Sequence, residues 1–151
     1  MLAVGTYTIV RDAAAAGNLG DIPPAVARYF DTALGHHQAA LEAWNDVLVA
    51  AGRPVATRAP VNLAISVNEQ LGPVVSAVGA ARLALSLERL VAATYLDALG
   101  KLVAAPTVTL AGSILVIDRQ HVALLLFALG RYPVPETFAN ADLAYVPLSD
   151  A

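Results

Sequence analysis

The sequence predicts an all-α fold built from two helical hairpins. Apolar residues recur at steps of three and four through four long stretches of the chain, which is the periodicity of a helix with one buried side. Short links join the first stretch to the second and the third to the fourth, whereas the link between the second and third is long. That order of connections is typical of an up-down bundle in which one crossover joins two antiparallel hairpins.

Glycine and proline mark where each helix is expected to begin and end. The first helix stops before the Gly17–Gly20 turn, and the second begins near Pro23 and Pro24 and stops at Gly52. The expected helices are residues 2–16, 23–51, 74–101 and 107–130, with a short helical piece at 63–71 inside the long connection. Residues 131–151 contain three prolines and no periodicity, so we expect an extended tail lying over the bundle.

The composition predicts one closely packed domain over residues 1–151. The chain is 58% hydrophobic and 14% charged, and its net charge is −3, so it can bury a sizeable core and is not disordered. Its nine basic residues form no cluster, which argues against a nucleic-acid partner. It has no cysteine, which excludes disulfides and thiolate metal ligands.

The high mean hydropathy of +0.63 raises the question of a membrane span. The longest uncharged run, residues 102–117, is shorter than the roughly 20 residues that a spanning helix needs. Four polar residues, Asp118 to His121, follow it and would lie in mid-bilayer. We therefore expect no transmembrane segment. The first residues lack the basic region and cleavage site of a signal peptide, so the cytoplasm is the default location and the compartment stays open.

Three of the predicted helices carry a polar side chain on their apolar side. Glu88 lies on the apolar side of the third helix, His37 on that of the second, and Asp118 and His121 three residues apart on that of the fourth. A buried polar group without a partner costs several kcal/mol, so we expect the four side chains to converge. The polar side of the third helix is expected to be Arg82, Ser86, Arg89, Ala93 and Asp97.

Four short stretches give the sequence a family resemblance. They are residues 35–45 around His36-His37, 87–96 around Glu88, 117–123 around Asp118 and His121, and the closing residues 132–138. With these stretches the chain resembles ferritin-like domain proteins of the desiccation-related type, especially the alanine-rich bacterial members. The resemblance covers nearly the whole chain and implies a ferritin-like four-helix bundle.

The ferritin-like pattern of metal ligands runs Glu, Glu-x-x-His, Glu, Glu-x-x-His, one element per helix. Glu88 matches the third element, and Asp118 with His121 matches the fourth, with Asp in place of Glu. The second element falls on His37 and Ala40, so one ligand type is changed and the other is lost. The first Glu falls just before Met1, and we expect the chain to begin inside helix one.

The resemblance therefore implies a degenerate metal site. Two carboxylates and two imidazoles suit one divalent ion better than a di-iron centre, and iron, manganese and zinc all fit the donor set. An equal alternative is a metal-free bundle that serves as a structural or interaction module. The sequence assigns no reaction and no catalytic residue. A truncated helix one would leave apolar faces uncovered, so we expect a homo-oligomer or a protein partner that covers them.

Overall fold

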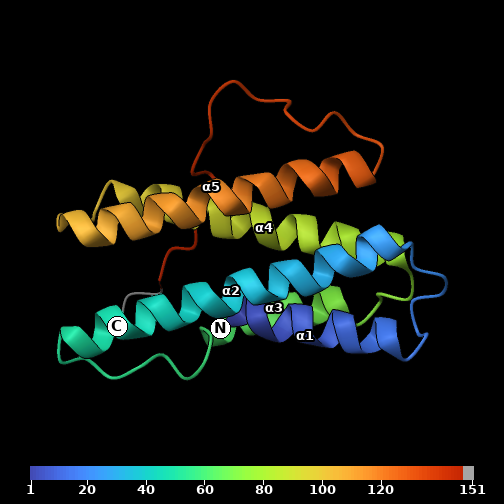
Figure 1. Cartoon of the computed structure of the whole chain (residues 1–151), viewed down its shortest axis with the longest axis horizontal. Helices are drawn as coiled ribbons and strands as arrows, with labels where there is room; N and C mark the ends of the chain where they lie inside the picture. Colours follow the sequence, from blue (N-terminus) through green and yellow to red (C-terminus); the bar gives the residue numbers. More distant parts are fainter. Residues whose placement is uncertain (148–151) are drawn as a thin grey trace. The chain divides into compact units, whose positions relative to one another are not determined.

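The computed structural model describes residues 1–147, and all of its regular structure is helical (Figure 1). The helices are α1 (Leu2–Ala15), α2 (Pro24–Ala50), α3 (Val61–Leu71), α4 (Ala77–Leu99) and α5 (Ala105–Ala128). No strand occurs among the described residues, so the predicted all-α fold class is confirmed. The expected helix limits agree with the observed ones to within three residues, and the short piece in the long connection is α3.

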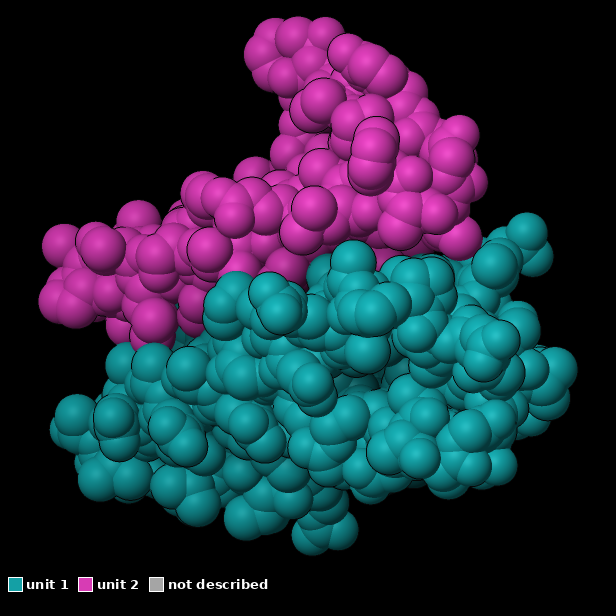
Figure 2. All heavy atoms as spheres, turned by 45° about the vertical axis from the view of Figure 1, so that its right-hand side comes forward, with its two compact units in different colours: residues 1–84 teal, residues 85–151 magenta. Residues whose placement is uncertain are grey.

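The chain divides into two compact units, and the division falls inside α4 (Figure 2). Unit 1 is residues 1–84, and unit 2 begins at Leu85. The prediction of a single domain over the whole chain stays a prediction.

Unit 1 is organised by the α1–α2 hairpin. Gly17 and Gly20 have positive φ angles of 75° and 71°, a conformation that side chains with a Cβ rarely adopt, and they reverse the chain between the two helices. The buried residues of α1 follow helical spacing, and those of α2 occupy a matching stripe: Ala3, Thr6, Tyr7 and Val10, then Phe30, Ala33, Leu34 and His37. The hairpin is therefore held by one apolar face of each helix.

The long connection after α2 is fixed at several points within unit 1. Gly52 (φ 66°) ends α2, and the next amide, that of Arg53, donates a hydrogen bond to the carbonyl of Leu48. The Asn45 side chain accepts a hydrogen bond of 2.9 Å from the amide of Ala56. Farther along, α3 packs against α1, with Val67 as its buried residue. The helical piece thus satisfies backbone groups that an irregular connection would leave exposed.

Unit 2 consists of the second hairpin and the tail. The part of α4 from Leu85 onward and α5 are joined by a short link, and Gly112 on α5 faces the side chain of Leu99 on α4. Residues 131–147 contain no helix or strand. They leave the end of α5, arc away from it and return to the hairpin (Figure 1). Residues 148–151 of the predicted tail lie outside the described residues.

Helix α5 is long and apolar enough to cross a membrane by length and composition alone, with a mean hydropathy of 1.5 over its most apolar window. This differs from the sequence argument, which counted only the uncharged run before Asp118. A single such helix is weak evidence for a span, because a core helix meets the same criteria. Two of its buried residues, Asp118 and His121, are polar, which a lipid-facing helix would not tolerate.

Candidate metal centre

Glu88 is a carboxylate with no exposure to solvent, in the middle of α4. Leu85, Leu87 and Ala92 of the same helix are also buried, whereas Arg89 is half-buried. A charged group in such surroundings must be neutralised by a proton, a cation or close donors. Glu88 therefore has the burial that is typical of a functional carboxylate.

Asp118 and His121 lie one turn apart on α5, and their exposed fractions are 1% and 4%. They share a face with apolar residues that fix the helix in the hairpin, namely Ala111, Val122 and Leu125. Residues three apart in a helix project to the same side. The spacing that the sequence shows therefore places a carboxylate and an imidazole side by side in the interior.

The two helices bring these three side chains together within unit 2. The Nδ1 atom of His121 lies 3.2 Å from Oε1 of Glu88. One ligand-type atom from each of Glu88, Asp118 and His121 lies within 4.8 Å of the others. Two ligands at about 2.0–2.2 Å from one ion are roughly 3 to 3.5 Å apart. The cluster therefore approaches the spacing of a single coordination sphere.

The donor set fits one divalent ion and does not fit two. Two carboxylates supply the charge that offsets a divalent cation, and an imidazole adds a nitrogen ligand that zinc, iron and manganese accept. A ferritin-like di-iron centre draws a carboxylate from each of four helices. Here α1 contains one acidic residue, Asp12, which is exposed and bonded to Arg11 at 2.8 Å. Helix α1 therefore carries no buried carboxylate that could serve as the first ligand of the pattern.

His37 lies in unit 1, where its side chain is buried at 7% exposure. Its ring stacks on that of Tyr7, with centroids 5.4 Å apart and planes at 26°. The Tyr7 hydroxyl is in turn 2.8 Å from the hydroxyl of Tyr29. The neighbouring His36 is exposed. His37 is thus fixed in orientation, and its role as a metal ligand stays a prediction.

Sequence reasoning gave Tyr7 no part in the site. Tyr7 lies on the same side of the helix as Ala3, Thr6 and Val10, one turn after Ala3. That position predicts core packing but does not predict an aromatic partner. That Tyr7 stacks on an imidazole depends on the pairing of α1 with α2, which local periodicity does not specify.

The family assignment follows from the match to a family model. The model of the ferritin-like domain matches residues 6–131, which is most of the chain, and the chain therefore belongs to the ferritin-like domain family. No curated protein and no solved structure matches the chain. The match supports the family and leaves the desiccation-related type and a truncated helix one unconfirmed.

Proposed function

We propose that this protein is a ferritin-like metal-binding protein that holds one divalent transition-metal ion at Glu88, Asp118 and His121. The observation that carries the proposal is the closeness of these three buried side chains on α4 and α5. Buried ionisable groups gathered at one point mark candidate functional sites. Iron, manganese and zinc are the ions that suit the donors best.

His37 is proposed as a fourth ligand on the strength of the sequence pattern, in which it occupies the second ligand element. Ala40 removes the imidazole that normally accompanies that element. The proposed site therefore has fewer ligands than a di-metal centre, and we assign it one ion per chain. When bound, such an ion can act as a Lewis acid or exchange an electron; the role of the four residues is to hold it in the interior.

Membership of the desiccation-related type is part of the same proposal and rests on the four stretches that carry the resemblance.

One observation favours a second candidate, a structural or interaction module without metal. The contact of 3.2 Å between His121 and Glu88 also lets the imidazole and the carboxylate interact directly, with no ion between them. Such a pair would satisfy much of the buried polarity with no ion. The two candidates differ in metal content and make opposite predictions for it.

Metal analysis of protein purified without added metal, followed by titration with Co²⁺ as a spectroscopic probe, tests the proposal. We expect about one ion per chain, and loss of binding in the nearly isosteric variants Glu88→Gln and Asp118→Asn. Asp97→Asn is the matched control, because Asp97 is on α4 but pairs with Lys101 at the surface. Wild-type protein that neither carries metal nor binds Co²⁺ would establish the metal-free module instead.

A further inference from the structure

The tail is fastened to both helices of the second hairpin. The amide of Tyr145 donates a hydrogen bond of 2.9 Å to the hydroxyl oxygen of Thr94 on α4. The same hydroxyl donates to the carbonyl of Leu90 at 2.7 Å, which fixes its lone pairs toward the tail. Nearer to α5, the guanidinium of Arg119 lies 3.3 Å from the Glu136 carboxylate. The segment from Glu136 to Tyr145 thus connects α5 to α4.

Both attachment points are on the helices that carry the three clustered side chains, Thr94 on α4 and Arg119 on α5. Arg119 directly follows Asp118 and precedes His121 by two residues. Thr94 is six residues beyond Glu88, which is about 9 Å along the helix axis. Because the helices are antiparallel and Leu99 faces Gly112, Thr94 lies opposite a part of α5 less than one turn before Asp118. The tail therefore returns to the hairpin at nearly the level of the cluster.

We propose that residues 131–147, by attaching to and detaching from the α4–α5 hairpin, control exchange between solvent and the cluster of Glu88, Asp118 and His121. We call this segment the clasp. Thr94 and Glu136 are its positioning residues. This inference rests on the proposed function, because the species that exchanges is the bound ion. The attachment of the tail to the hairpin does not depend on any metal.

The two fastenings differ in how they should respond to conditions. The Arg119–Glu136 pair is partly exposed, and such pairs are weak and are screened by salt. The hydrogen bond between Tyr145 and Thr94 is partly buried and is not ionic. A segment without helix or strand, whose residues are mostly exposed, opens locally without unfolding the rest. Raised salt should therefore loosen the tail, and loss of the Thr94 hydroxyl should release its far end.

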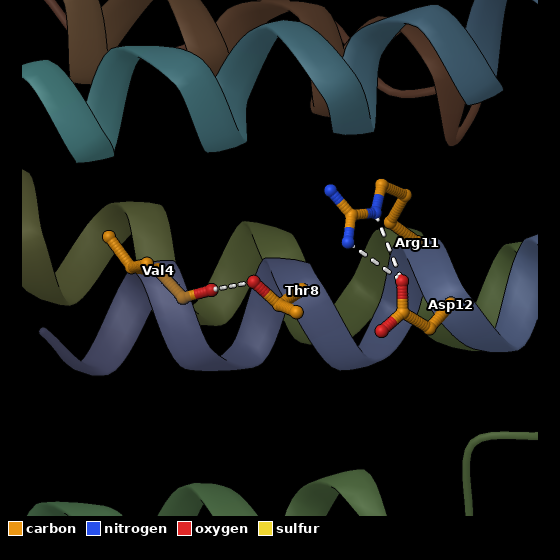
Figure 3. A network of polar contacts seen from close by, with 4 residues as sticks. All are labelled: Val4, Thr8, Arg11 and Asp12. Carbon is orange, nitrogen blue, oxygen red and sulfur yellow. Dashed lines mark hydrogen bonds and ion pairs between the residues drawn. The ribbon is translucent and has the colours of Figure 1, made fainter.

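Hydrogen exchange of the metal-free protein tests the fastening itself. We expect the Tyr145 amide to be protected in the wild type and to exchange about two- to tenfold faster in Thr94→Val, the range that loss of one hydrogen bond produces. Thr94→Ser should restore protection. Thr8→Val is the matched control, because Thr8 makes the same bond to the carbonyl four residues back, Val4, on α1 (Figure 3). A Tyr145 amide that is unprotected in the wild type would overturn the clasp whatever the metal content.

Release of Co²⁺ from the loaded protein into excess chelator tests the control of exchange. We expect release about two- to tenfold faster in Thr94→Val and in Glu136→Gln, with one ion still bound per chain. Asp12→Asn, which breaks the exposed pair with Arg11 (Figure 3), should leave the rate unchanged. Exchange of the C2 proton of His121 with deuterium gives a readout that needs no metal.

The outcomes separate the two proposals. Absence of bound metal in the wild type would overturn the proposed function, and the His121 proton exchange would then decide on the clasp. Variants that deprotect Tyr145 but change neither ion release nor His121 exchange would overturn the clasp as a control on the site.

Discussion

The imidazole of His121 contacts the carboxylate of Glu88 across the α4–α5 interface, with Nδ1 and Oε1 3.2 Å apart. Both side chains are buried, and they come from residues 33 positions apart in the sequence. Glu88 is the buried charged residue of α4 and gains its imidazole contact from α5. The contact therefore links the stability of the second hairpin to the integrity of the proposed site.

Loss of the imidazole should destabilise the metal-free protein. We expect His121→Ala to lower the free energy of unfolding by about 3 kcal/mol, because it leaves the buried Glu88 carboxylate without the imidazole that contacts it. Urea unfolding followed by far-ultraviolet circular dichroism measures the change. A double-mutant cycle with Glu88→Gln should give a coupling of about 1 kcal/mol or more. Strictly additive effects in that cycle would show that the two residues do not stabilise each other.

The adjacent histidines of α2 provide a matched test of the fourth ligand. His37→Gln should weaken Co²⁺ binding by at least about tenfold, the lower end of what even an outer-shell substitution costs a metal site. His36→Gln, one residue away but exposed, should leave affinity unchanged. Equal affinities for the two variants in a Co²⁺ titration would remove His37 from the ligand set and leave a three-residue site.

Most of the fold could be predicted from the sequence because its signals are local. Glycines with positive φ stand at the ends of α1 and α2, and apolar stripes mark the buried faces. One stripe residue was assigned wrongly: Ala93 was expected on the polar side of the third helix, but it is buried. Alanine is small and only weakly apolar, so in an alanine-rich helix its position on the wheel gives little information about its side.

The site was partly predictable for the same reason. The spacing of Asp118 and His121 placed both on one face of a helix, and Glu88 stood out as a charge among apolar residues. The tail contacts gave no such signal: a backbone amide such as that of Tyr145 can bond to any acceptor. The sequence around Thr94 likewise gives no sign that its hydroxyl accepts a hydrogen bond from the amide of Tyr145. Long-range contacts of irregular segments depend on the completed fold.

The outward side of α5 leads to the last prediction, self-association. Its exposed apolar residues lie on one side of the helix and end in Phe127, at 72% exposure; the others are Val116 and Leu124. An apolar stripe of this kind on a ferritin-like helix favours an interface with a second copy of the chain.

We expect sedimentation velocity to show a species larger than the 15.6 kDa chain. The double substitution Leu124→Ser and Phe127→Ser should shift it toward the monomer while the helical signal persists. Val103→Ser serves as the control, because Val103 is almost fully exposed but lies in the link before α5. A wild-type protein that sediments as a monomer at every concentration would contradict the expected homo-oligomer.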